Sequence, residues 1–98
     1  MEKRKPHFRL ELVKQAVADQ RYRFTRVALE GGAALGMEMA DMLAVISALS
    51  SRDFFKSMTT HADHTTWQDV YRPDTEFGQV YLKFTLVADL LIVSFKEK

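Results

Sequence analysis

Apolar residues in the first half of the chain recur at the spacing of one helical face. Leu10, Val13 and Val17 share such a face and predict a helix over residues 8–19. A longer stripe in MEMADMLAVISALS predicts a second helix, and its members are Met39, Met42, Leu43, Ile46 and Leu49. Methionine readily fills irregular gaps in a core, so we interpret these methionines as packing residues rather than sulfur ligands.

The segment between these two helices has a weaker pattern. Arg21 to Phe24 alternates charged and aromatic residues, which fits a short strand or a linker. Thr25 is a suitable N-cap for a further helix through Leu29. The glycines of EGG at 30–32 should end or loosen that helix, because glycine destabilises a helix interior.

After Ser50 the pattern changes to that of strands. DFFKSMTT and WQDVYRP are rich in aromatic and β-branched residues, and GQVYLKFTLV and LLIVSFK are the most strand-like parts of the chain. Helices followed by an antiparallel meander of about four strands predict an α+β architecture. A chain of this length makes one domain, residues 1–98.

The last two strands meet at VADL, where Ala88 and Asp89 can form a two-residue loop. Three pairs then lie on one apolar face of the hairpin: Leu82 with Phe95, Phe84 with Val93, and Leu86 with Leu91. The other face pairs Lys83 with Ser94 and Tyr81 with Lys96. A slip of one residue would mix the two faces, so the pattern itself favours this register.

The preceding strand adds polar side chains to the second face. If DTEF at 74–77 is the connecting loop, Val70 faces Tyr81, and Gln68 and Arg72 join Tyr81 on one surface. Amide, phenol, guanidinium and ammonium groups then gather without a carboxylate, a combination that attracts phosphate. A solvated sheet face with long polar side chains is the alternative.

Trp67 and Tyr71 alternate with Gln68 and Val70, which places them on the opposite side of the same strand. Aromatic side chains can hold single-stranded RNA by stacking on its bases. We favour the other interpretation, in which both rings pack in the core against the helices.

Composition narrows the class of protein. Hydrophobic residues make up 47% of the chain and charged residues 28%, which is typical of a folded, soluble domain. The absence of cysteine excludes disulfides, thiolate metal sites and a cysteine nucleophile. No window approaches the roughly 20 apolar residues of a membrane span, and no signal peptide is recognisable. We therefore expect a cytoplasmic protein without a membrane segment.

Charge is divided unevenly along the chain, although the net charge is only +1. Residues 1–26 carry eight basic and three acidic side chains, and residues 27–51 carry three acids and no base. A basic end can attract a polyanion such as RNA, or an acidic protein partner. A merely soluble surface is the alternative.

The pair His61 and His64 in HADH raises the question of a metal site. Catalytic zinc needs about three protein ligands, and the candidates for a third follow no recognisable pattern: Asp63, Asp69 and His7. We therefore expect no metal and interpret His64 as a loop histidine, either near an RNA phosphate or simply solvated. Ser57, His64 and Asp69 have the residue types of a catalytic triad, but FKSMT is not a nucleophile elbow.

Four runs, DFFKSMTT, DHTTWQDVYRP, GQVYLKFTL and LLIVSFKEK, closely resemble in order and spacing the MqsR toxins of MqsR/MqsA toxin–antitoxin systems. The opening MEKR, followed by PH and RL, fits as well, so the resemblance covers nearly the whole chain. It implies a RelE-like α+β fold and a sequence-selective endoribonuclease that cuts mRNA at GC-containing sites. It also implies a cognate antitoxin that itself binds zinc. The toxin would then need no cofactor, would be a monomer when free, and would form a hetero-oligomer with the antitoxin.

Carried over position by position, the resemblance implies four residues in cleavage: Lys56, Gln68, Tyr81 and Lys96. The last three already share a face in the predicted strand pairing, whereas Lys56 comes from the resemblance alone. The chemistry would be attack of the ribose 2′-OH on the adjacent phosphate, with Tyr81 as the group for proton transfer and lysines stabilising phosphate charge. Further contacts to RNA are expected from Arg72, Lys83 and His64.

Two other functions remain open at this point. A non-catalytic RNA- or protein-binding regulatory module would use the basic first 26 residues and the same sheet face. A metal-dependent hydrolase would use His61 and His64, and chelation of metal would abolish its activity.

Overall fold

Two of the three helices form where hydrophobic stripes predict them, and the third follows the predicted N-cap Thr25. In the computed structural model, which describes residues 1–98, α1 spans Leu10–Ala18, α2 spans Arg26–Ala34 and α3 spans Met39–Ser47. Thr25 caps α2 as predicted, because its hydroxyl accepts a hydrogen bond of 3.1 Å from the N–H of Ala28. None of the helices has both the length and the apolar character needed to cross a bilayer.

The strands form a mixed sheet with more members than the sequence predicts. Their bounds are β1 Glu2–Lys3, β2 Tyr22–Phe24, β3 Phe54–Thr59, β4 Trp67–Tyr71, β5 Asp74–Thr75, β6 Gly78–Val87 and β7 Asp89–Glu97. The order across the sheet is β1-β3-β4-β6-β7-β2, and β5 pairs with β6 beside this path. The α+β class is confirmed, whereas the count of about four strands is wrong. β1 and β5 are too short to show a strand pattern. At Arg21 to Phe24 the structure has the short strand rather than the linker, and this strand, β2, pairs in parallel with β7, far away in the sequence.

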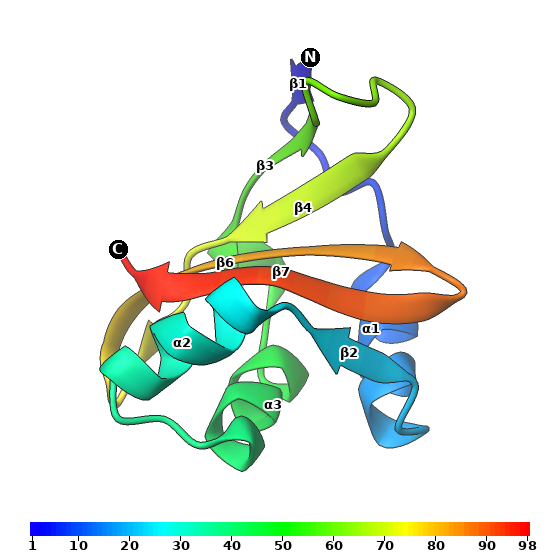
Figure 1. Ribbon diagram of the computed structural model, residues 1–98. Coiled ribbons are helices and arrows are strands. Elements are labelled where there is room, and N and C mark those ends of the chain that lie inside the picture. The colour runs from blue at the N-terminus through cyan, green and yellow to red at the C-terminus, as the bar shows by residue number, and fades with distance from the viewer.

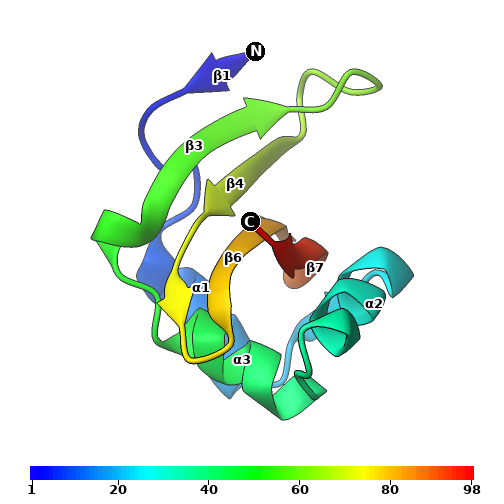
Figure 2. The ribbon, with the colours of Figure 1, turned by 90° about the vertical axis from the view of Figure 1, so that its left-hand side faces the viewer.

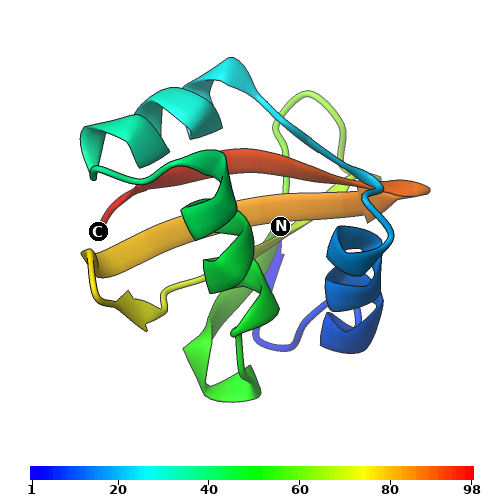
Figure 3. The ribbon, with the colours of Figure 1, turned by 90° about the horizontal axis from the view of Figure 1, so that it is seen from below.

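The helices cover one side of the sheet and one edge. α1 and α3 pack beneath β6 and β7, while β2 and α2 follow each other along the outer edge of β7 (Figures 1 and 3). β1, β3 and β4 bend away from the two long strands (Figure 2). The side chains of one core fill the space between helices and sheet: Val13, Ala16, Ala28, Met37, Met42, Ile46, Leu49, Tyr71, Val80, Leu82, Phe84, Leu90, Ile92 and Phe95. Of the predicted stripe, Met42, Ile46 and Leu49 belong to this core, whereas Leu43 is only partly buried and Met39 is 43% exposed.

The predicted end of α2 at the EGG segment is wrong, because the helix continues through both glycines to Ala34. A Cβ atom added at Gly31 would lie 1.9 Å from the carbonyl oxygen of Phe95, and one at Gly32 would lie 2.2 Å from the sulfur of Met42. Both glycines therefore let α2 approach β7 and α3 closely. This tertiary gain outweighs a helix-propensity cost of about 1 kcal/mol per glycine.

The hairpin of β6 and β7 follows the predicted register only in its outer half. Leu82 pairs with Phe95, Lys83 with Ser94, and Tyr81 with Lys96, as predicted. Towards the turn the pairs are Phe84 with Ile92, Leu86 with Leu90, and Val87 with Asp89, one residue away from the prediction. A bulge at Val93 causes the shift, and Ala88 alone turns the chain with a φ of 64°. Leu91, Ile92 and Val93 are all apolar, so the sequence pattern did not reveal which of them points inwards.

The register of β4 against β6 also differs from the prediction, by two residues. Val70 pairs with Lys83 rather than with Tyr81, because the connecting loop is shorter than DTEF. Asp74 and Thr75 form β5 and pair with the start of β6, which leaves only Glu76 and Phe77 in the turn. A slip of two residues keeps every side chain on its predicted side of the sheet.

Replacement of Gly31 with alanine tests whether close packing or helix propensity determines the change in stability at this position. We expect Gly31→Ala to destabilise the protein by about 1–3 kcal/mol, because the new methyl group meets a backbone carbonyl that cannot move away. Urea unfolding followed by circular dichroism measures the change. Ala33→Gly, at an exposed position of the same helix, is the control and should cost about 1 kcal/mol or less. Propensity alone would make Gly31→Ala stabilising, and that result would contradict our account.

Candidate functional site

The strand register brings the predicted site residues to one side of the sheet. Lys56 of β3 pairs with Val70 of β4, Val70 pairs with Lys83 of β6, and Lys83 pairs with Ser94 of β7. Paired residues on neighbouring strands project to the same side, and so do residues two apart on one strand. The resulting surface, which we call the cationic face, consists of Lys56, Gln68, Arg72, Tyr81, Lys83 and Lys96. It lies on the opposite side of the strands from the core residues Leu82 and Phe84.

Tyr81 and Lys96 form the contact at one end of this face. They are direct cross-strand partners, and the Lys96 ammonium lies 5.4 Å from the centre of the Tyr81 ring. Tyr81 is partly buried, whereas Lys96 is exposed. A phenol ring and a cation are thus held close together.

Lys56 lies at the other end and has a partner that the sequence did not reveal. Its ammonium donates a hydrogen bond of 2.8 Å to the carboxylate of Glu2, and its side chain is only 19% exposed. Glu2 belongs to β1, opposite Met58 of β3, so its side chain reaches the cationic face. The hydrogen bond and the charge of Lys56 lower the pKa of Glu2. The expectation of a face without a carboxylate is therefore wrong, because a two-residue strand is invisible in the sequence pattern.

The guanidinium of Arg72 stacks on the ring of Phe55, a residue that was not among the candidates predicted from the sequence. Its guanidinium carbon lies 3.7 Å from the centre of the Phe55 ring, a distance typical of a stacked cation. Phe55 occupies the register shift between Phe54 and Lys56 in β3, and the shift leaves it without a cross-strand partner. Arg4 also lies near this ring, 5.7 Å from its centre. Phe55 therefore positions the guanidinium groups of Arg72 and Arg4 at the border of the cationic face.

Lys83 occupies the middle of the cationic face. It is partly buried, and its ammonium has neither a hydrogen bond nor an ion pair with any carboxylate. Burial lowers the pKa of Lys83, and the nearby charges of Lys96 and Lys56 lower it further. Lys83 thus differs chemically from the lysines that flank it.

The histidines of the HADH segment stand in an exposed loop between β3 and β4. Asp63 organises this loop by accepting hydrogen bonds from the N–H and hydroxyl of Thr65 and from the hydroxyl of Thr66, which lower its pKa to about 2. Nowhere do three His, Asp or Glu side chains come together as metal ligands. The loop places His61 and His64 in solvent, and nothing in its contacts ties either one to the cationic face.

Ser57, His64 and Asp69, which have the residue types of a catalytic triad, do not come together as one. Ser57 and Asp69 pair across β3 and β4 but are both fully buried, on the side away from the cationic face. Asp69 accepts hydrogen bonds from the backbone N–H groups of His7 and Phe8, at 2.9 to 3.1 Å. Its role is to fasten the N-terminal segment to the sheet.

The two aromatic residues of β4 pack rather than form an open stacking platform. Tyr71 is fully buried and stacks on Phe84, as expected for a core residue. Trp67 is partly buried, but the N-terminal segment covers it instead of a helix. The His7 ring stacks on Trp67 at 5.3 Å, and the Lys3 ammonium lies 4.3 Å from the centre of its ring.

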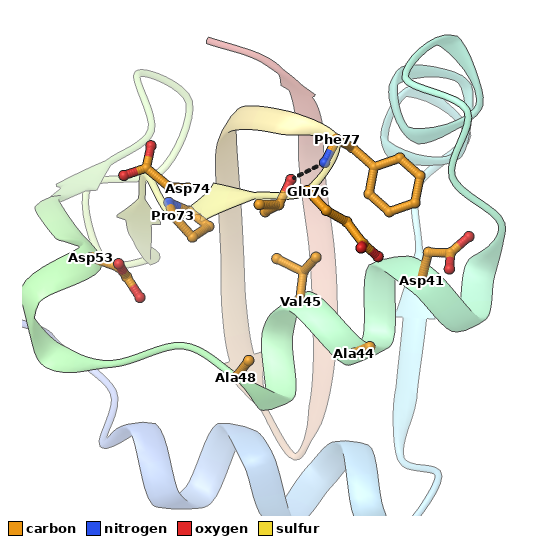
Figure 4. A pocket seen from close by; sticks show the side chains of 10 residues that line it. Asp41, Ala44, Val45, Ala48, Asp53, Pro73, Asp74, Glu76 and Phe77 are labelled. Carbon is orange, nitrogen blue, oxygen red and sulfur yellow. Dashed lines mark hydrogen bonds between the residues drawn. The ribbon is translucent and has the colours of Figure 1, made fainter.

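A pocket of about 250 Å³ lies on the helical side, between α3 and the turn after β5 (Figure 4). Its apolar lining includes Val45 and Phe77, and four carboxylates surround it: Asp41, Asp53, Asp74 and Glu76. Such a lining repels anions, so this pocket is not part of a site for phosphate.

A sheet face with three lysines, a stacked arginine, an amide and a phenol is suited to a phosphodiester chain, since cations hold phosphate and a phenol can exchange protons. The fold and site are thus those of an α+β protein with a cationic sheet face. The chain matches the family described as "Motility quorum-sensing regulator, toxin of MqsA" over residues 5–97 and belongs to that family. It is also similar to a protein of Escherichia coli (strain K12) named mRNA interferase toxin MqsR, with 57% identity over 98 residues and 100% of both chains covered. The resemblance found in the sequence is confirmed.

The ion pair of Glu2 with Lys56 predicts that Glu2 competes with phosphate for this lysine. We expect Glu2→Gln to tighten binding of a short 2′-O-methylated RNA at low salt, because the ammonium of Lys56 is then free to bind phosphate. The gain should be only about 2- to 5-fold, because an ion pair of this kind at the protein surface contributes little free energy and is screened by salt. Fluorescence anisotropy at two salt concentrations measures the change. Glu11→Gln, which removes a carboxylate paired with Arg9 on the helical side, is the matched control. Unchanged or weaker binding by Glu2→Gln would rule out the competition.

Proposed function

We propose that this chain is the toxin of a type II toxin–antitoxin system and an endoribonuclease that cleaves mRNA at GC-containing sites without a metal ion. Membership of a toxin family and 57% identity to an mRNA interferase support the toxin and ribonuclease activities. The cationic face is the observation that carries the proposal. Its groups are those that bind phosphate and transfer protons, whereas a metal site would gather imidazoles and carboxylates.

In the proposed reaction, the ribose 2′-oxygen attacks the adjacent phosphorus while the bond from phosphorus to the 5′-oxygen breaks. The products are a 2′,3′-cyclic phosphate and a free 5′-OH. One group must take the proton of the 2′-OH, and another must give a proton to the leaving oxygen. Tyr81 takes part in this proton transfer, and its partly buried ring beside Lys96 supports the assignment.

The other residues of the cationic face bind and orient the substrate. Lys56 and Lys96 stabilise the charge that develops on the five-coordinate phosphate, a kind of stabilisation that is strong when the charges are already in place. Gln68 orients the phosphate or the ribose. Arg72, stacked on Phe55, binds a neighbouring phosphate, and Lys83 lies between these contacts. His64 is a further RNA contact from the loop after β3.

The partners follow from the family. We infer a cognate antitoxin, related to MqsA, that carries its own zinc and forms a hetero-oligomer with this toxin in the cytoplasm. The free toxin would be a monomer with one domain, residues 1–98. The likeness to RelE-type ribonucleases is a prediction, supported by helices that cover one side of a sheet (Figure 1) and by the register that places cationic side chains on the other side.

A non-catalytic RNA-binding module would use the same face, and cleavage in EDTA separates the two functions. We expect the purified protein to cut an mRNA that contains GC sites at discrete positions in excess EDTA, because the proposed groups are all side chains. Primer extension maps the cuts, and an mRNA without GC sites is the control. Tight binding of intact RNA would favour the binding module, and cleavage only without EDTA would favour a metal-dependent hydrolase.

Removal of the Tyr81 hydroxyl tests its place in proton transfer. We expect Tyr81→Phe to lower kcat about 100-fold or more while the KM stays nearly constant, since a general acid or base contributes about 10² to 10⁴ in rate. Single-turnover cleavage of a short RNA measures both values. Tyr22→Phe in β2, at the far edge of the sheet, should cleave like the parent. Near-normal kcat in Tyr81→Phe would remove this tyrosine from the mechanism.

A further inference from the structure

The three lysines of the cationic face differ in what their ammonium groups contact. Lys56 binds the carboxylate of Glu2 at 2.8 Å, and Lys96 lies 5.4 Å from the centre of the Tyr81 ring. Both contacts are ones that an ammonium makes with an anion or an aromatic ring. Lys83 has neither kind of partner, although it is more enclosed than Lys96. A lysine in such a place is the one whose neutral amine is easiest to form.

The position of Lys83 also suits contact with the reacting atoms. It lies in the middle of the face, opposite Val70 on one side and Ser94 on the other. Tyr81 is two residues away on the same strand and projects to the same side. A phosphate held between Lys56 and Lys96 would therefore lie over Lys83, with Tyr81 beside it.

We propose that Lys83 is the general base, which takes the proton of the 2′-OH on its neutral amine, and that Tyr81 is the general acid. This assignment rests on the proposed ribonuclease function and deepens it. The bond between the 2′-oxygen and phosphorus forms as the proton moves to Lys83. The bond to the 5′-oxygen breaks as the phenol of Tyr81 gives up its proton. Lys83 then returns its proton to solvent and Tyr81 takes one up, so each turnover begins from the same state.

The charges around Lys83 support a base rather than an acid. Lys56 on β3, Lys96 on β7 and Arg72 directly after β4 all place positive charge on this surface, and Glu2 on β1 is bound to Lys56. Like charges and burial both disfavour an ammonium, which is why the pKa of Lys83 is lowered. A lysine whose ammonium is disfavoured in this way more readily supplies the neutral amine that a general base must have. The opposite assignment would need a charged Lys83 and an ionised Tyr81.

Replacement with arginine separates proton transfer from charge. Lys83→Arg keeps a cation for RNA but cannot become neutral near pH 7, because arginine has a pKa above about 12. We expect kcat to fall about 100-fold or more, and the affinity for 2′-O-methylated RNA to stay within about 3-fold. Lys14→Arg on α1 is the matched control and should cleave like the parent. Cleavage by Lys83→Arg at more than about a third of the parental kcat would overturn the proposal.

The pH profile gives a readout that a structural role would not move. For the parent, kcat should rise tenfold per pH unit around neutrality and level off at the pKa of Lys83, since only the free amine acts as base. In Lys83→Ala, added methylamine should restore cleavage in proportion to its unprotonated form. Two results would contradict the assignment. One is a rescued rate that depends on the total concentration of methylamine rather than on its unprotonated form, and the other is a parental kcat that does not change between pH 6 and 8.

A measurement on the parent protein keeps the proposal testable if the variants fold poorly. Nitrogen NMR of labelled lysine side chains should show Lys83 losing its proton at lower pH than Lys14, and a titration at or above the ordinary value near 10.4 would overturn the base role. Cleavage of mRNA by the parent in EDTA decides the proposed function separately. If the parent cleaves and Lys83→Arg cleaves equally well, only the assignment of the base fails.

Discussion

The pairing of β6 with β7 is the interaction on which the rest of the structure depends. These two long strands lie side by side near the middle of the sheet, and their alternate side chains point to opposite sides. One set, including Leu82 and Phe95, is fully buried in the core. The other set contains Tyr81, Lys83 and Lys96. A slip of one residue would bury lysine and expose phenylalanine, so the free energy of core formation also holds the site in register.

The bulge at Val93 shifts this pairing by one residue towards the turn. Beyond it, Leu90 and Ile92 point inwards and are fully buried, while Leu91 and Val93 are only partly buried. The same strand lies against α2, where Gly31 permits a helix to approach the carbonyl of Phe95. β7 therefore contacts the core, the edge helix α2 and the cationic face.

The cationic face carries unfavourable electrostatic energy in the free protein. Lys56, Lys83 and Lys96 repel one another, and Glu2 and the rings of Tyr81 and Phe55 compensate only in part. A phosphate backbone would relieve this repulsion, and such an attraction weakens with salt. Burial and the charges of Lys96 and Lys56 also disfavour the ammonium of Lys83. In the mechanism that we propose, binding and proton transfer therefore depend on one arrangement of charge.

The sequence by itself determined the class of fold and placed most residues of the cationic face on one side of the sheet. Periodicity located the helices and the four main strands, and the alternation of apolar and polar residues was enough to pair Tyr81 with Lys96. Only the tertiary structure decided that Glu2 reaches Lys56, that Phe55 supports Arg72, and that α2 continues through its glycines. The reason is physical: periodicity reports which side of its own element a residue takes. Contacts between elements depend on short strands, bulges and close backbone approaches, whose energies arise only once the chain is folded.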